Sequence, residues 1–247
     1  MDPGPYEAAP LPIRADLAAA YRRARDHLAR PGTWWSGAER VALMAEARNA
    51  PQCKLCRARK EALSPTVISG AHDSLGELSD IAVEVVHRIR TDPGRLTRGW
   101  FDDVIRAGLS PEQYVEIVSV VAHTVALDTF ARGVGLAGLP LPRPSDGAPS
   151  RYRPPGAKPG PAWVPWIESE DLTDAEAGIY PMGRPPANIH RAMSLVPPEV
   201  GSFFDLCEHM YFGPLEMRDF EHEFRAITHA QVELLAARVS ALNRCFY

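Results

Sequence analysis

The stretch that decides the fold is Gln231-Val-Glu-Leu-Leu-Ala-Ala-Arg-Val-Ser-Ala-Leu-Asn-Arg-Cys-Phe-Tyr247. Its apolar side chains recur at helical spacing, which predicts an α-helix with one buried stripe. The stripe consists of Val232, Leu235, Ala236, Val239 and Leu242. Cys245 follows Glu233 by twelve positions, a third of a turn more than three full helical turns. We therefore expect the carboxylate and the thiol on neighbouring faces of this helix.

The rest of the chain shows helical periodicity and no strand-like alternation, so the predicted fold is an all-α helical bundle. The clearest start signal is Ser110-Pro-Glu-Gln113, which supplies an N-cap, a proline at the first helical position and a capping-box glutamine. The apolar, β-branched interior that follows would also suit a strand, but the cap and the length favour a central helix. The helices are expected over residues 16–30, 37–49, 57–63, 75–91, 95–107, 110–132, 187–195 and 198–211, and from about Met217 or Ala226 onward.

The composition is that of an ordinary globular protein, with 247 residues, 45% hydrophobic residues, 23% charged residues and a net charge of −4. This length suits one domain or two small ones. The charge gives no reason to expect nucleic acid or an acidic membrane as a partner. No transmembrane-length apolar run or signal peptide is recognised, so a cytoplasmic location is expected. In that reducing compartment, four cysteines indicate redox or metal chemistry more than structural disulfides.

The stretch ending RVSALNRCFY resembles the redox helix of the alkylhydroperoxidase D-like / carboxymuconolactone decarboxylase family. In that family's peroxidase branch the helix carries a glutamate, then Cys-x-x-Cys, then a histidine one turn later. The resemblance implies that Glu233 is the glutamate and Cys245 the first cysteine. The second nucleophile would fall directly after Tyr247, where some members carry selenocysteine, which is encoded by a codon otherwise read as stop. We therefore expect an alkylhydroperoxidase-related (seleno)protein read only to that codon; a chosen boundary, a frameshift and a true terminus are the alternatives.

Two further segments resemble the same family. Residues 78–136 are similar to the part downstream of the redox helix, and residues 188–214 to the part upstream of it. The implied organisation is two tandem helical units, the second of which ends inside its redox helix. The expected boundaries are a disordered lead over 1–12, a first unit over 13–137, an exposed Pro/Gly-rich linker over 138–166 and a second unit over 167–247. Trp163 and Trp166 are expected to anchor the far end of the linker.

Cys53-Lys-Leu-Cys56 is a Cys-x-x-Cys motif at a predicted helix end. A helix N-terminus stabilises a thiolate, and a cysteine three residues away can resolve a sulfenic acid or mixed disulfide. Lys54, Arg57, Arg59 and Lys60 add cationic surroundings. Lys60 stands where the family would have its histidine, and neither Glu39 nor Glu46 has the family's spacing. A redox pair, a non-functional relic and half of a zinc site therefore stay open; Cys207 and His209 are the only obvious candidates to complete the zinc site.

The expected function is a thiol- or selenol-dependent peroxidase or disulfide oxidoreductase. Its catalytic residues would be Cys245, Glu233, Cys53 and Cys56, with Glu233 as the base and with neither cofactor nor metal. Its partners would be a peroxide or disulfide, an external thiol reductant and further copies of the chain, since family members commonly form trimers or hexamers. The alternatives are a non-enzymatic helical interaction module and a decarboxylase-like lyase. Four histidines are expected to be solvated or satisfied, with the second in the core and bonded to a backbone carbonyl: His72, His123, His222 and His229.

Overall fold

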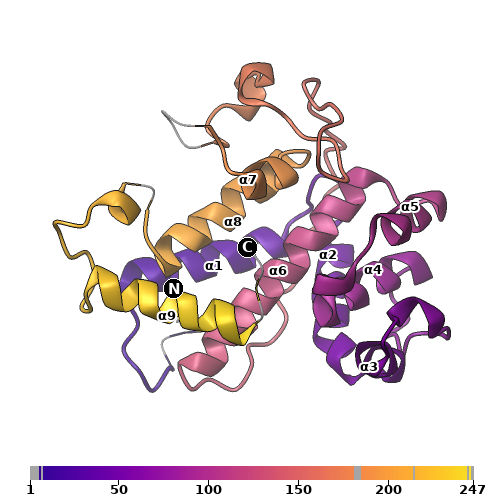
Figure 1. The fold of residues 1–247 in the computed structure, drawn as a ribbon, viewed down its shortest axis with the longest axis horizontal. Helices are drawn as coiled ribbons and strands as arrows, with labels where there is room; N and C mark the ends of the chain where they lie inside the picture. The colour runs from indigo at the N-terminus through magenta and orange to yellow at the C-terminus, as the bar shows by residue number, and fades with distance from the viewer. Residues whose placement is uncertain (1–5, 7, 181–184, 214, 244, 246–247) are drawn as a thin grey trace.

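The computed structural model describes residues 6, 8–180, 185–213, 215–243 and 245 (Figure 1). In these ranges the regular structure is helical, and the only β pairing is an isolated bridge between Lys158 and Trp166. The α-helices are α1 (Ala15–Ala29), α2 (Gly37–Asn49), α3 (Lys54–Glu61), α4 (Asp80–Thr91), α5 (Arg98–Arg106), α6 (Pro111–Gly133), α7 (Asn188–Met193), α8 (Pro197–Met210) and α9 (His229–Leu242). The 3₁₀ turns are η1 (Ala50–Gln52), η2 (Pro65–Val67), η3 (Pro93–Arg95), η4 (Ser169–Asp171), η5 (Asp174–Glu176) and η6 (Glu216–Arg218). The all-α prediction is confirmed.

Helix starts follow the capping chemistry of the sequence. Ser36 and Glu39 form a capping box at α2, which spans the predicted residues 37–49. Ser110 and Gln113 form another at α6, with a proline at its first position. Each box satisfies two backbone N–H groups that a helix start would otherwise leave without partners. The strand alternative for the α6 segment is therefore wrong.

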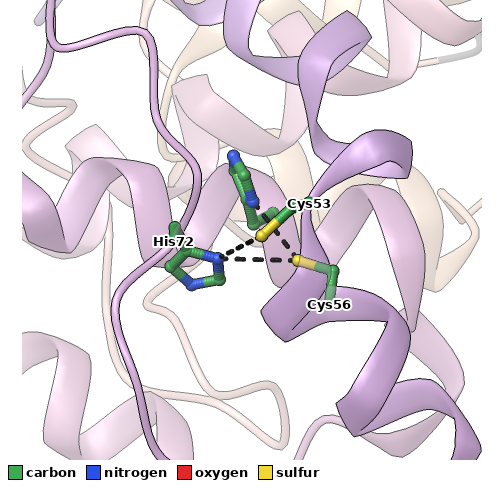
Figure 2. Close-up of side chains that lie close together, drawn as sticks. Cys53, Cys56 and His72 are labelled. Atoms are coloured by element: carbon green, nitrogen blue, oxygen red, sulfur yellow. Dashed lines mark hydrogen bonds between the residues drawn. The ribbon is translucent and has the colours of Figure 1, made fainter.

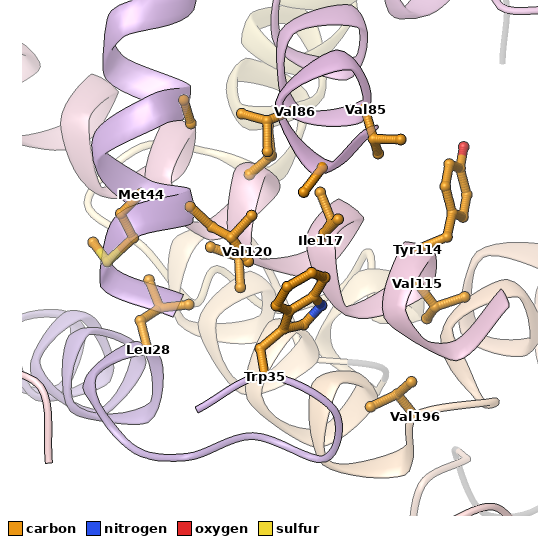
Figure 3. Packing of buried hydrophobic residues seen from close by; sticks show 14 of the residues in the cluster. Leu28, Trp35, Met44, Val85, Val86, Tyr114, Val115, Ile117, Val120 and Val196 are labelled. Carbon is orange, nitrogen blue, oxygen red and sulfur yellow. The ribbon is translucent and has the colours of Figure 1, made fainter. Parts of the chain in front are cut away.

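Helix α6 lies in the middle of the molecule and contacts α1, α2, α4, α7 and α8 (Figure 1). Ile117 and Val120 on α6 pack with Leu28, Met44 and Val86 from three other helices (Figure 3). By length and composition α6 is apolar enough to cross a membrane, contrary to the expectation that no such run exists. More than half of its most apolar window is buried inside the molecule, as in the core helix of a soluble protein.

One hydrophobic core joins residues from both predicted units. Leu195, Val196 and Leu206 belong to the same buried cluster as Leu28 and Ile117. Helix α8 packs along α1, and both lie against α6 (Figure 1). Residues 13–137 thus share their interior with the segment that follows the linker.

The Pro/Gly-rich segment contains no α-helix, but it is not exposed throughout. The backbone N–H of Ser145 donates to Ala29 O at 2.8 Å, and that of Arg151 donates to Thr33 O at 2.9 Å. Trp166 is buried, whereas Trp163 stays exposed over about a third of its surface. The prediction of an exposed connector is therefore wrong for the stretches that lie against the first helices.

The lead also departs from expectation at Tyr6, whose ring is buried against Tyr21 and Phe130. The remaining lead residues 1–5 and 7 lie outside the described residues.

The C-terminal helix differs most from its prediction. α9 ends at Leu242, and Cys245 lies beyond it, so Glu233 and Cys245 do not project from one helix. Leu235, Val239 and Leu242 are each more than half exposed. Val232 and Ala236 are partly buried, so the stripe predicted to be buried is exposed at three of its five positions. Phe246 and Tyr247 lie outside the described residues.

Candidate thiol and histidine site

The Cys-x-x-Cys motif lies at the N-terminus of α3, as predicted. Cys53 is the N-cap residue and its N–H donates to Ala50 O at 3.1 Å, while Cys56 lies in the first turn. The first helical N–H, that of Lys54, donates to Asp73 Oδ2 at 2.8 Å. Both cysteines are buried. The short helix therefore presents two buried sulfur atoms at its positively polarised end.

Two histidines from other parts of the chain face these sulfur atoms. His72 lies in the loop after η2, and its Nδ1 is 3.5 Å from the Sγ atoms of both Cys53 and Cys56 (Figure 2). His87 comes from α4, and its Nδ1 is 3.2 Å from Cys56 Sγ. The two imidazole rings contact each other edge to face, with centroids 4.3 Å apart. One nitrogen of each ring is thus directed at the cysteine pair.

The other ring nitrogen of each histidine is held by a carboxylate. His72 Nε2 is 2.7 Å from Glu84 Oε2, and His87 Nε2 is 2.7 Å from Glu46 Oε1. A carboxylate accepts, so in both pairs the imidazole donates its Nε2–H. The site therefore contains two ordered chains, Glu84–His72–Cys53/Cys56 and Glu46–His87–Cys56.

Both carboxylates are fixed by further donors. Arg59 Nη1 donates to Glu84 Oε2 at 2.8 Å, and Trp100 Nε1 donates to Glu84 Oε1 at 3.0 Å. Glu46 accepts from Asn49 Nδ2 and from the backbone N–H of Leu75, each at 3.0 Å. These contacts tie α2, α3, α4 and α5 to one site and fix the orientation of both rings.

The site perturbs its ionisable groups. Burial would raise the pKa of the Cys53 thiol, but N–H groups of Cys56 and Asp73 and a hydrogen bond with His72 bring it below the ordinary value. Burial would lower the pKa of His72, but hydrogen bonds with Cys56 and Glu84 raise it to about 10. Burial lowers the pKa of His87, although Glu46 acts in the opposite direction. Metal-free, the site thus keeps His72 protonated and His87 neutral at pH 7, and it favours the thiolate form of Cys53 more than water does.

The carboxylates stay ionised in this environment. Burial would raise the pKa of Glu84, but His72 and Arg59 lower it to about 2. Burial acts in the same way on Glu46, and hydrogen bonds from Asn49 and His87 lower its pKa below the ordinary value.

Two cavities reach the site. One of about 220 Å³ is lined by Cys56 and by the cationic side chains of Arg57, Lys60 and Arg90. The other, of about 500 Å³, is lined in part by His72 and Glu84. A small molecule can therefore approach Cys56 from one cavity and the His72–Glu84 pair from the other.

The structure does not place the predicted C-terminal residues in this site. The Glu233 side chain is 47% exposed; it accepts a hydrogen bond from Tyr211 and lies 3.4 Å from His229 Nε2. This carboxylate is thus open to solvent over nearly half of its surface. Cys245 is exposed. The two predicted pairs of site residues have separate surroundings, and Cys53 and Cys56 are the pair that lies in the buried group of sulfur and nitrogen ligands.

The sequence analysis did not predict a role in this site for His72, His87 or Glu84. His72 was expected to be solvated or satisfied, and the zinc alternative considered Cys207 and His209 instead. Both of those residues lie on α8, away from α3 in the chain and in the bundle (Figure 1). One usable signal existed, because Glu84 and His87 are three residues apart on one helix and so share a face.

A second buried polar cluster lies among α1, α2, α6 and α8. Arg40 Nη1 donates to Glu116 Oε1 at 2.7 Å and to Glu199 Oε1 at 2.8 Å, and all three side chains are fully buried. Glu199 also accepts from Ser119 Oγ at 2.6 Å and pairs with His27 Nε2 at 2.9 Å. This cluster joins four helices and contains its own cation.

His123 lies at the edge of the same cluster. It is fully buried, and its Nδ1 is 2.9 Å from Ser119 O. The prediction of a core histidine bonded to a backbone carbonyl is confirmed.

No protein-family model, no curated protein and no solved structure matches the chain. The resemblance to the alkylhydroperoxidase D-like family therefore stays a prediction, and the site is interpreted from its own geometry.

Proposed function

We propose that this protein is a thiol-dependent peroxidase or disulfide oxidoreductase that uses Cys56 and Cys53 as its redox pair. The observation that carries the proposal is the buried chain Glu46–His87–Cys56, with contacts of 2.7 and 3.2 Å, at the end of a cavity. A carboxylate that orients an imidazole, which in turn faces a nucleophile, is the arrangement that activates a thiol. The sequence alone had assigned the base to Glu233; Glu46 and His87 replace it in this proposal.

The proposed cycle begins at Cys56, because this is the cysteine that lines the cavity. His87 Nδ1 takes the proton of the Cys56 thiol, and the thiolate attacks one peroxide oxygen. The O–O bond breaks, the sulfur becomes a sulfenic acid, and the leaving alkoxide takes the proton from His87 to give an alcohol. His87 therefore acts first as the base and then as the acid.

Cys53 completes the oxidative half of the cycle. Its thiolate attacks the sulfenic sulfur of Cys56 and forms the disulfide, and the departing hydroxide takes a proton from His72 to leave as water. Two equivalents of an external thiol then reduce the disulfide and leave as their own disulfide. A disulfide substrate would enter at the same step as the peroxide and would give a mixed disulfide on Cys56.

The cavity suggests the kind of substrate. Arg57, Lys60 and Arg90 surround the approach to Cys56. Cationic side chains favour anionic groups, so the proposal favours hydroperoxides or disulfides that carry a carboxylate. An uncharged alkyl hydroperoxide should react more slowly than a carboxylated one of the same size.

The test uses a Cys207→Ser/Cys245→Ser background, in which only the pair remains. One equivalent of hydroperoxide, added to the reduced protein in the presence of a chelator, should give a Cys53–Cys56 disulfide by mass spectrometry. Cys53→Ser should stop the reaction at a sulfenic acid on Cys56, which dimedone traps. His87→Ala should slow it by about 10²–10⁴-fold.

The matched control is His209→Ala, a partly exposed histidine of α8. This variant should react like the background protein. Two intact thiols after treatment, or a reaction no faster than that of a free cysteine, would overturn the proposal and favour the interaction-module or lyase alternatives.

A further inference from the structure

The two sulfur atoms and the two facing nitrogens form a compact group. The Sγ atoms of Cys53 and Cys56 and one nitrogen each of His72 and His87 all lie within 4.8 Å of one another. The three residues Cys53, Cys56 and His87 are buried, and His72 is exposed only in small part. Four ligand atoms from three separate segments thus meet at one point of the interior.

Three sulfur–nitrogen distances among these atoms are close to the edges of a metal-centred tetrahedron. With Zn–S bonds of about 2.3 Å and Zn–N bonds of about 2.0–2.1 Å, the edge between sulfur and nitrogen is about 3.6 Å. The Nδ1–Sγ separations here are 3.5 Å from His72 to each cysteine and 3.2 Å from His87 to Cys56. These three separations lie within about 0.4 Å of the zinc values, and all the separations among the four atoms are at most 4.8 Å, so the group is compact enough to close around a Zn²⁺ ion.

The outer contacts also suit a metal. Zinc-bound histidines ordinarily donate their second N–H to a carboxylate or carbonyl, which fixes the ring and leaves the other nitrogen for the ion. Glu84 and Glu46 hold the Nε2 atoms of His72 and His87 in this way at 2.7 Å. The backbone N–H of Asp73 points at Cys53 Sγ at 3.5 Å, a contact that stabilises a thiolate. The carboxylates thus orient the two imidazoles, and a backbone N–H supports one of the two sulfur atoms.

We infer that Cys53, Cys56, His72 and His87 form a tetrahedral Zn²⁺ site in the reduced protein. Two thiolates and two imidazoles are ligands suited to zinc and poorly suited to magnesium or calcium, which prefer oxygen. All four ligands come from the chain, which is typical of a structural rather than a catalytic zinc. Two thiolates balance the charge of the ion, so the buried centre carries no net charge.

The inference goes beyond the proposed function, because the ion needs only the four ligands and no thiol reactivity. The zinc site and the proposed redox function are linked because both use the sulfur atoms of Cys53 and Cys56. When a peroxide oxidises the zinc-bound pair, two protons are consumed, one alcohol and one water form, and the disulfide loses both thiolate ligands. Two imidazoles alone bind Zn²⁺ weakly, so the ion should leave as the disulfide forms.

The experiment uses the full chain, reduced and freed of metal by a chelator that is then removed. Zn²⁺ is titrated against a chromophoric competitor, and Co²⁺ is added separately as a spectroscopic probe. We expect one Zn²⁺ per chain, and with Co²⁺ the visible absorption of a tetrahedral centre with thiolate charge transfer. Glu46→Gln and Glu84→Gln should each weaken Zn²⁺ binding by about 10–100-fold.

The matched control is Cys207→Ser/His209→Ala, which removes the other candidate ligands. It should bind Zn²⁺ like the wild-type protein, whereas Cys53→Ser/Cys56→Ser should not bind it. The wild-type Co²⁺ spectrum keeps the test valid if a variant fails to fold. Absence of stoichiometric Zn²⁺ with thiols shown to be reduced, or loss of binding only in the control, would overturn the site.

The two proposals fail separately. Zn²⁺ binding by a protein whose metal-free thiols resist peroxide would refute the redox function and support the zinc site. Disulfide formation by a protein that binds no Zn²⁺ would refute the zinc site and leave the redox function.

Discussion

The Arg40 guanidinium lies between two buried carboxylates, and its replacement gives the sharpest test of the core. Arg40→Met keeps most of the side-chain volume but leaves Glu116 and Glu199 without the guanidinium that bridges them. Removing one partner from a buried ion pair costs about 3–5 kcal/mol. Two buried nitrogens of Arg40, Nε and Nη2, have no hydrogen-bond partner, so the substitution also removes a desolvation cost. We therefore expect a loss of about 3 kcal/mol in the free energy of unfolding.

The matched control is Arg23→Met. Arg23 makes two hydrogen bonds to Asp205, at 2.9 and 2.8 Å, but the two side chains are 52% and 35% exposed. An ion pair at the surface is worth about 0–1 kcal/mol, because water screens it. Urea unfolding followed by circular dichroism measures both variants, since stability changes linearly with urea concentration.

A second variant separates charge from packing. Arg40→Met combined with Glu116→Gln and Glu199→Gln removes the uncompensated charges and should recover part of the lost stability. If Arg40→Met costs no more than Arg23→Met, the buried carboxylates do not depend on the guanidinium, and the reasoning is refuted.

Two other predictions concern the same cluster. In Gly32→Ala the new Cβ would lie 1.8 Å from Glu116 Oε1 and 2.1 Å from Arg40 Nη1. Urea unfolding should therefore show a loss of about 1–3 kcal/mol in the free energy of unfolding. The control Gly94→Ala, whose Cβ would have no atom within 4 Å, should lose less, and equal losses would contradict the argument. Burial would raise the pKa of Glu199, but Arg40 and His27 hold it well below its ordinary value of 4.5. Its contribution to stability is therefore present above pH 4.5 and falls as the pH drops toward the folded-state pKa, so Glu199→Gln should lose less stability than wild type between pH 5 and pH 3 in the same assay. Parallel losses in the two proteins would show that Glu199 carries no such linkage.

The parts of the fold that depend on local chemistry could be predicted from the sequence. The Ser36–Glu39 and Ser110–Gln113 capping boxes fixed two helix starts, because each involves residues three positions apart. Cys53 and Cys56 were expected at a helix end, and the helix, predicted over 57–63, begins three residues earlier at Lys54. Local signals of this kind need no knowledge of the tertiary structure.

The site itself depends on contacts across the chain, and these were missed. His72 and His87 lie 19 and 31 positions from the cysteines they contact, counted from Cys53 and Cys56 respectively. Nothing in a single sequence shows that the loop after η2 and the middle of α4 meet at α3. For this reason the zinc alternative named Cys207 and His209 as further ligands and not His72 and His87.

The terminal helix shows the opposite error, in which a correct local pattern led to a wrong tertiary conclusion. The periodicity of α9 is real, and Thr228 and Gln231 cap its start. Periodicity shows that a helix has an apolar face, but it does not show that another element covers that face. Leu235, Val239 and Leu242 stay more than half exposed, so the helix does not bury these positions of its apolar face.

The two buried polar clusters meet the same physical problem in different ways. Buried carboxylates or thiolates need positive charge nearby, because the interior solvates them poorly. In the cluster among α1, α2, α6 and α8, Arg40 lies between the two carboxylates and supplies that charge. In the cysteine and histidine site, Arg59 reaches only Glu84, and within the described residues no lysine or arginine donates to either sulfur atom. The sulfur atoms instead face imidazole nitrogens at the distances a bound cation would require. An arginine neutralises the carboxylates of one cluster, whereas two imidazole nitrogens face the two sulfur atoms of the other. Two sulfur and two nitrogen ligands suit Zn²⁺, which is why we assign metal binding to Cys53, Cys56, His72 and His87 and not to the carboxylates around Arg40.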